Sequence, residues 1–222
     1  MSAFPIRLVK SQGFANYLAS LKFAFYVMTH PLDGFWDLTR EKRGTMAAAH
    51  TFVIFTVIIE IMRLMLSSFQ FVIVQMEYFN VMLVIAQILL PVALWTVANW
   101  SLTTLMDGKG RLSEIYMGVG YAMLPYALIN AALIPLSHLI TAQEGAIYWA
   151  LTTFAVISLV FLLICAMMQI HDYSLSKTLG SSLLTLVAIG VMIFIFVMFF
   201  SVVSDAIAYF ISVFREVWFR ML

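Results

Sequence analysis

The chain has 222 residues, of which 64% are hydrophobic and only 10% are charged, and its formal net charge at pH 7 is +1. An ordinary soluble domain has about 25% charged residues, so this composition excludes a water-soluble fold of the usual kind. The near-neutral charge also argues against nucleic-acid binding, which needs a clustered basic face.

Residues 1–45 form a basic segment without a long apolar run. No apolar stretch of about 7–15 residues leads to a small-residue cleavage site, so we expect no cleaved signal peptide. Within this segment, Phe14 to Met28 mixes polar residues with aromatic and aliphatic ones. That mixture is typical of a helix lying among lipid headgroups. We therefore expect a cytoplasmic N-terminal segment with one interfacial helix.

Five stretches are long and apolar enough to cross a bilayer, whose hydrocarbon core needs about 20 residues of helix. The first runs from Met46 to about Leu66 and contains two charged residues. The other four contain none and lie between Glu77 and Asp107, between Glu114 and Glu144, between Gly145 and His171, and between Lys177 and Asp205. The sequence predicts an all-α polytopic membrane bundle with five transmembrane helices at residues 46–204 and amphipathic segments at both ends.

Lysine and arginine fall in alternate loops, which predicts the orientation because basic loops are retained in the cytoplasm. They occur before the first span and in the loops Met106–Glu114 and His171–Lys177, whereas Ser67–Asn80 and Ser137–Gly145 have none. We therefore expect a cytoplasmic N-terminus and an external C-terminus. Residues 205–222 then form an extracytoplasmic amphipathic tail. This tail is either a separate interfacial helix or a continuation of the fifth span.

Glu60 and Arg63 lie inside the first span, three residues apart, so their side chains can form an ion pair. Ionisable residues within a membrane are a functional-site hypothesis by default. Arg63 is close enough to the end of its span to reach the interface, which favours a structural ion pair. A transport or proton-relay role is the alternative.

The third span is the expected centre of the bundle. Gly118 and Ala122, then Ala127 and Ala131, repeat a spacing of small residues that lets helices approach closely. Asn99 in the second span and Asn130 in the third are expected to form hydrogen bonds between helices.

No phosphate-binding loop, zinc-binding helix or nucleophile elbow occurs in the sequence. The single cysteine, Cys165, lies in an apolar run, and three histidines on different loops do not form one metal site. We therefore predict no enzymatic activity, no cofactor and no metal. The loop MDGKGRLSE, Met106–Glu114, gathers charged residues around two glycines, so it could contact a phosphate or a soluble partner, although a solvated turn is the simpler interpretation.

Two segments resemble the Yip-domain family. The segment HPLDGFWDLTREKRG, His30–Gly44, looks like the stretch before the first span in bacterial members, and Gly118–Pro125 is similar to that family's glycine–tyrosine and proline segment. The resemblance implies a bacterial plasma membrane protein with five spans, a cytosolic N-terminus and an outward C-terminus. The chain lacks the long acidic N-terminal domain and the DLYGP element of eukaryotic members. The resemblance therefore implies architecture and a membrane-adaptor role only.

The soluble segments are too short for a catalytic or ATP-binding domain. We therefore predict a scaffold or accessory subunit of a larger membrane complex, with an integral membrane partner such as an ABC-type transporter. The alternative is a small transporter or channel component acting on its own, with Glu60, Arg63, Asn99 and Asn130 lining the path. The candidate partner contacts are Asp33, Phe35, Trp36 and Asp37 in the HPLDGFWDL loop, and Gly118, Gly120, Tyr121, Ala122 and Pro125 in the third span.

Overall fold

The computed structural model of the chain describes residues 6–73 and 79–221, which form helices joined by short connections. The elements are α1 (Ile6–Thr29), α2 (Pro31–Arg40), α3 (Met46–Leu66), α4 (Val81–Leu105), α5 (Leu112–Leu139), the short 3-10 helix η2 (Ala142–Glu144), α6 (Gly145–His171) and α7 (Leu175–Met221). No strand occurs in these ranges, which confirms the all-α prediction. Five helices, α3 to α7, are long and apolar enough to cross a membrane.

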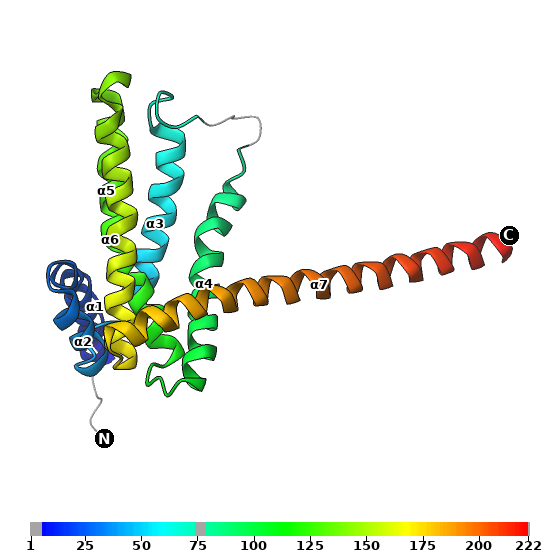
Figure 1. The fold of residues 1–222 in the computed structure, drawn as a ribbon, viewed down its shortest axis with the longest axis horizontal. Helices are drawn as coiled ribbons and strands as arrows, with labels where there is room; N and C mark the ends of the chain where they lie inside the picture. The colour runs from blue at the N-terminus through cyan, green and yellow to red at the C-terminus, as the bar shows by residue number, and fades with distance from the viewer. Residues whose placement is uncertain (1–5, 74–78, 222) are drawn as a thin grey trace.

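Helices α3, α4, α5 and α6 run side by side (Figure 1), and α5 contacts each of the other three. In the most apolar 18-residue window of α5, 56% of the residues are buried, compared with 33% or less in the other four candidate spans. The prediction that the third span is the centre of the bundle is confirmed.

Two glycines let α5 approach its neighbours on both sides. A Cβ atom at Gly120 would lie 3.0 Å from the Cβ and carbonyl oxygen of Ala49 on α3. A Cβ atom at Gly118 would lie 2.6 Å from Cδ1 of Ile170 on α6. The small-residue spacing therefore acts inside the chain. Asn130 donates to the carbonyl of Tyr126 on its own helix at 2.8 Å, so the expected contact between helices is not made by its amide nitrogen.

The HPLDGFWDL segment is a helix, α2, and our description of it as a loop was wrong. Pro31 occupies the first turn, where its missing N–H costs no hydrogen bond, and Asp33 and Arg40 suit the two ends of the helix dipole. Phe35 and Leu38 are buried against the rest of the bundle. Helix α2 packs against α1 and α6.

Helix α1 is tied to the bundle by a buried polar cluster. Ser20 and Tyr121 of α5 form a hydrogen bond through their hydroxyl groups. The backbone N–H of Thr45, which caps the start of α3, donates to Ser20 Oγ at 3.0 Å. The segment predicted to be interfacial therefore packs with one face on α3 and α5, while Phe14 and Phe25 remain exposed.

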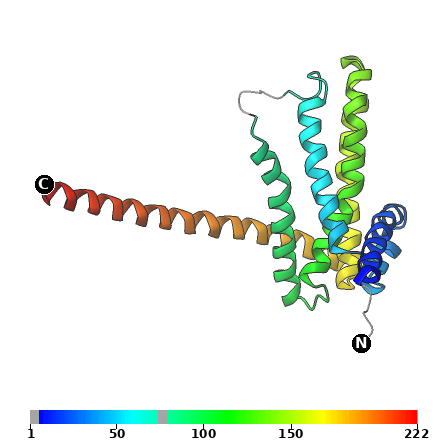
Figure 2. The same ribbon diagram turned by 180° about the vertical axis from the view of Figure 1, so that it is seen from behind.

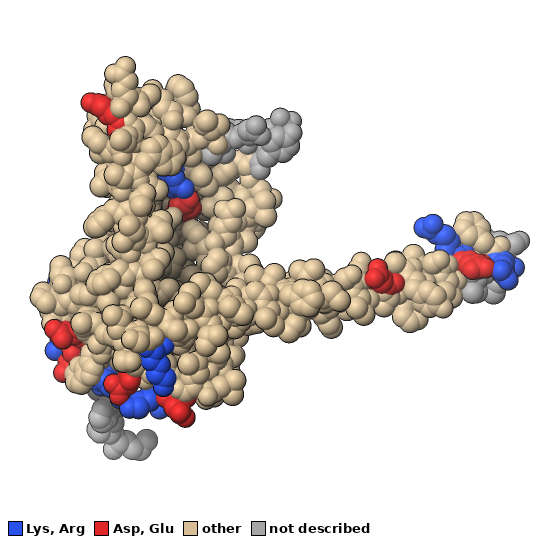
Figure 3. Space-filling view, viewed as in Figure 1, with Lys and Arg blue, Asp and Glu red and all other residues tan. Residues whose placement is uncertain are grey.

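Connections that were predicted to share a side of the membrane lie at the same end of the bundle. The Ser68 N–H donates to Ser137 Oγ at 2.9 Å, which joins the two loops without basic residues. At the opposite end, Tyr173 donates to the carbonyl of Met106 at 2.8 Å, which joins the two basic loops. Lysine, arginine and acidic atoms gather at this second end, near α1 and α2 (Figure 3). We call it the charged end.

Helix α7 has 47 residues, a length of about 70 Å, and it runs across the other four long helices rather than along them (Figures 1 and 2). Thr178, Ser181 and Thr185 are buried near its start, where it packs on α4. Beyond Thr185 none of its described residues is buried. The helix continues without a break through Asp205, so the C-terminal tail is an extension of the fifth apolar stretch and not a separate helix.

Candidate functional site at the charged end

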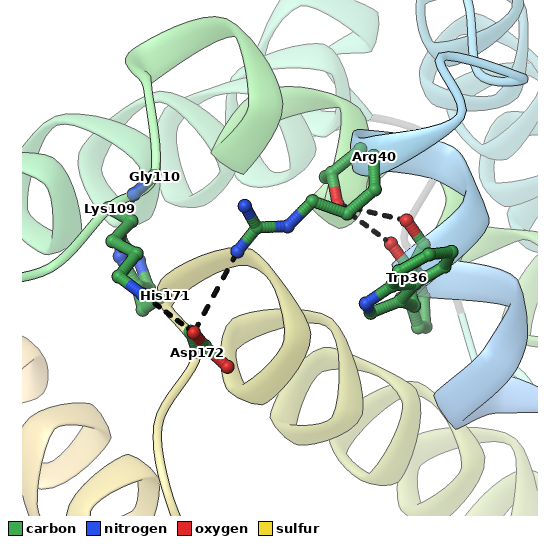
Figure 4. Close-up of polar contacts among 8 residues, drawn as sticks. Trp36, Arg40, Lys109, Gly110, His171 and Asp172 are labelled. Carbon is green, nitrogen blue, oxygen red and sulfur yellow. Dashed lines mark hydrogen bonds and ion pairs between the residues drawn. The ribbon is translucent and has the colours of Figure 1, made fainter.

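Asp172 joins three segments at the charged end (Figure 4). Its Oδ2 atom lies 2.7 Å from Nζ of Lys109, in the loop between α4 and α5, and 3.9 Å from Nη2 of Arg40 on α2. The hydrogen bond from Lys109, the charge of Lys109 and the weaker charge of Arg40 hold the pKa of this carboxyl below its ordinary value. Asp172 is therefore ionised at neutral pH.

Asp172 follows the last residue of α6 and has a left-handed backbone conformation with φ of 59°. Aspartate and asparagine adopt this conformation more readily than most residues, because their short side chains form local hydrogen bonds. The turn ends α6 and places the carboxylate beside α2 and the α4–α5 loop (Figure 4).

His171, directly before Asp172, is buried and connects the α4–α5 loop to α4. Its Nδ1 accepts a hydrogen bond from the Gly110 N–H at 3.3 Å, and its Nε2 lies 2.9 Å from Oδ1 of Asn99. An acceptor at Nδ1 and an amide oxygen facing Nε2 fit the neutral imidazole with its proton on Nε2. Asn99 donates in turn to Oγ1 of Thr185 on α7 at 3.1 Å. The expected contact between helices is therefore confirmed for Asn99.

The two glycines of the α4–α5 loop allow it to close over the imidazole. A Cβ atom at Gly108 would lie 2.8 Å from Nδ1 of His171, and one at Gly110 would lie 2.7 Å from its Cε1. Both distances are too short for a real side chain, so any larger residue must displace the loop or the histidine. The loop is thus a packed part of the bundle and not a freely solvated turn.

We expect Asn99→Ala to lower the free energy of unfolding by about 2 kcal/mol, because His171 and Thr185 would both lose a buried hydrogen-bonding partner. Equilibrium unfolding in mixed detergent micelles measures this change. Asn16→Ala, on the exposed face of α1, is the matched control and should leave the stability unchanged. Equal stabilities of the Asn99→Ala variant and the natural protein would contradict the structural role of this contact.

Comparison with known families shows that residues 25–214 match the Yip1 domain. The chain belongs to the Yip1 domain family. A search of curated proteins and a search of solved structures returned no match. With its five long apolar helices, this Yip1 domain protein is an integral, multi-pass membrane protein. The match includes both segments that carried the resemblance, which are α2 and the middle of α5.

The candidate partner contacts separate into two groups in the Yip1 domain. Asp33 and Trp36 are exposed on α2. Asp37 is partly buried, and its Oδ2 atom lies 3.2 Å from Nη1 of Arg43. The remaining six are buried among this chain's own helices: Phe35, Gly118, Gly120, Tyr121, Ala122 and Pro125. In this conformation the six residues contact the chain's own helices. The role of all nine residues as partner contacts stays a prediction.

Glu60 and Arg63 form their ion pair within α3, separate from the charged end. Nε of Arg63 lies 3.1 Å from Oε2 of Glu60, and the two side chains are only 19% and 14% exposed. The hydroxyl of Tyr126 on α5 lies 3.5 Å from the same carboxylate oxygen. The pair thus belongs to the contact between α3 and α5, and its functional role stays a prediction.

Sequence reasoning missed the polar contact that attaches α7 to the Yip1 domain. Thr178, Ser181 and Thr185 recur at intervals of three and four residues, so they share one face at the start of the fifth apolar stretch. This pattern was visible in the sequence. Asn99, the partner of Thr185, and the buried imidazole of His171 lie 86 and 14 residues away from Thr185, so this contact could be learned only from the fold.

Proposed function

We propose that this Yip1 domain protein is a non-enzymatic scaffold or accessory subunit of a larger membrane complex, and that its partner is another integral membrane protein. One observation carries the proposal. Helix α7 packs on α4 through its first turns and then leaves the bundle, and none of its described residues beyond Thr185 is buried.

The exposed part of α7 is suited to contact inside a membrane. Residues 178–204 contain no charged side chain, and as a helix they extend for about 40 Å. Large exposed apolar surfaces are typical of interaction with another protein or with lipid. Phe194, Phe196, Phe199 and Phe200 give this surface bulky aromatic side chains that are all exposed.

The arrangement of basic residues supports a cytoplasmic location for the charged end, and hence for the N-terminus, in a bacterial plasma membrane. We also propose an external C-terminus, which requires α7 to run along the other four long helices in the membrane, and not across them as in Figures 1 and 2. An ABC-type transporter is the partner that we would test first, because the segments that join the five apolar helices are too short for an ATP-binding domain.

Photo-crosslinking in native membranes tests this proposal. A photoreactive phenylalanine analogue at Phe196 or Phe199, both exposed on α7, should form a discrete adduct with a second membrane protein. The same analogue at Phe52, which is buried between α3 and α5, should form none. Mass spectrometry of the adduct identifies the partner. Adducts with lipid alone, or only with a second copy of this chain, would contradict the proposal.

A second candidate function is a small transporter or channel component. It is favoured by a hollow of about 310 Å³ whose lining includes Thr56 of α3, Gln87 of α4 and Tyr126 of α5. Tyr126 also contacts the carboxylate of Glu60, so the hollow adjoins the intramembrane ion pair. Solute flux in proteoliposomes that disappears in a Glu60→Gln variant would support this function over the scaffold role.

A further inference from the structure

We propose that the charged end contains a binding site for a phosphate group. The site is a hollow of about 280 Å³, lined by Thr39, Arg40, Lys42, Lys109, Arg111 and Glu114 and by the apolar side chain of Ile170. A water molecule in the liquid occupies about 30 Å³, so the hollow has room for a phosphate group and several waters. This inference is independent of the proposed scaffold function.

Four cationic side chains from two distant parts of the chain meet at this hollow. Arg40 and Lys42 come from the end of α2 and the turn after it, and Lys109 and Arg111 come from the α4–α5 loop. Packing of α2 on α6, and of the glycine-containing loop on His171, holds the two pairs together. Arginine and lysine donate charge-assisted hydrogen bonds to phosphate oxygens, and a concave site lets several cations reach one anion.

Two carboxylates near the hollow neutralise only part of this charge. Glu114 accepts a hydrogen bond from the backbone N–H of Arg111 at 2.9 Å. Asp172 forms ion pairs with Lys109 and with the more distant Arg40. Within residues 6–73 and 79–221, neither Lys42 nor the Arg111 side chain forms an ion pair. The site therefore keeps two cations for a ligand, and Asp172 competes with that ligand for the other two.

The position of the hollow allows two sources of phosphate. It lies at the charged end of the apolar helices, and helices that span a bilayer present this end to the lipid headgroups, so the headgroup of an anionic phospholipid can reach it. A soluble phosphate or pyrophosphate can reach the same side chains, which are mostly exposed. The chemistry of recognition is the same for both sources.

Calorimetric titration of the purified full-length protein in a zwitterionic detergent tests the site. The probes are short-chain phosphatidylglycerol, short-chain phosphatidylcholine, inorganic phosphate and pyrophosphate. We expect binding of at least one anionic probe that weakens as salt is added. The double variant Lys42→Gln, Arg111→Gln should weaken it about tenfold, because two charge-assisted contacts are lost. Lys22→Gln, an exposed lysine on α1, is the matched control and should bind normally.

Asp172→Asn gives a test with the opposite sign. Asparagine tolerates the left-handed backbone at this position, and the substitution releases Lys109 and Arg40 from their carboxylate. Binding of the anionic probe should therefore become several-fold tighter. A gain of affinity cannot result from misfolding, so this variant keeps the proposal testable even if the double variant proves unstable.

Each outcome decides the proposal. Specific binding of phosphatidylglycerol alone supports a lipid headgroup as the ligand, and binding of phosphate or pyrophosphate supports a soluble source. No binding of any anionic probe would overturn the proposal. So would equal binding of phosphatidylglycerol and phosphatidylcholine with no response to phosphate or pyrophosphate, or an equal loss of affinity in the Lys22→Gln control.

Discussion

Arg63→Met is expected to lower the free energy of unfolding by about 3–4 kcal/mol. Its guanidinium forms an ion pair with Glu60, and the two side chains are 19% and 14% exposed. Removing one member leaves a buried charge without a partner, which costs far more than the net worth of the pair. Equilibrium unfolding in mixed detergent micelles measures the change.

The double variant Glu60→Met, Arg63→Met should recover much of this loss, because no unpaired charge remains within the bundle. The exposed pair of Arg220 and Glu216 on α7 offers a matched control. Arg220→Met should leave the stability unchanged, since exposed ion pairs contribute little. If the double variant were less stable than Arg63→Met, the ion pair would not be the cause of the loss.

The same variants separate the two functions considered for the protein. If Glu60 and Arg63 serve only to join α3 and α5, the double variant will still form the α7 adduct in native membranes. If they line a path for a solute, the double variant will be stable but inactive in proteoliposomes. The scaffold role therefore predicts that the double variant still forms the α7 adduct, and the transport role predicts that it loses solute flux in proteoliposomes.

The parts of the fold that could be predicted from sequence depend on local patterns. The absence of charge over more than twenty residues identified four of the five long helices, because a charge within lipid is costly, and the length of its apolar stretch identified α3. The pairing of Glu60 with Arg63 follows from their separation by three residues on one helix. The grouping of the basic loops at one end follows from the alternation of the spans.

Two features could not be predicted in this way. Thr178, Ser181 and Thr185 indicate which face of α7 packs at its start, but the course of the helix across the bundle left no signal, because beyond Thr185 the stretch is apolar on all sides. The buried imidazole of His171 contacts Asn99 and Gly110, which are distant in sequence, and Asn99 in turn contacts Thr185. By contrast, α2 could have been predicted from Pro31 at its start and from the charges at its two ends.

Gly34→Ala is expected to lower the free energy of unfolding by about 2–3 kcal/mol. A Cβ atom at Gly34 would lie 2.7 Å from the Cα atom of Val27 on α1, and a backbone atom cannot move aside as the end of a flexible side chain can. The substitution therefore forces α1 and α2 apart, with a cost typical of overpacking. Equilibrium unfolding in mixed micelles again measures the change.

Gly180→Ala in α7 is the matched control, because a Cβ atom there would have no atom within 4 Å. Alanine favours the helix over glycine by about 0.5–1 kcal/mol, so this variant should be slightly more stable than the natural protein. If Gly34→Ala lowers the stability and Gly180→Ala raises it, then the close approach of α1 and α2, and not helix propensity, requires glycine at position 34. Since α2 supplies Arg40 and holds Lys42 at the hollow, Gly34→Ala should also weaken binding of phosphate there, whereas Gly180→Ala should not.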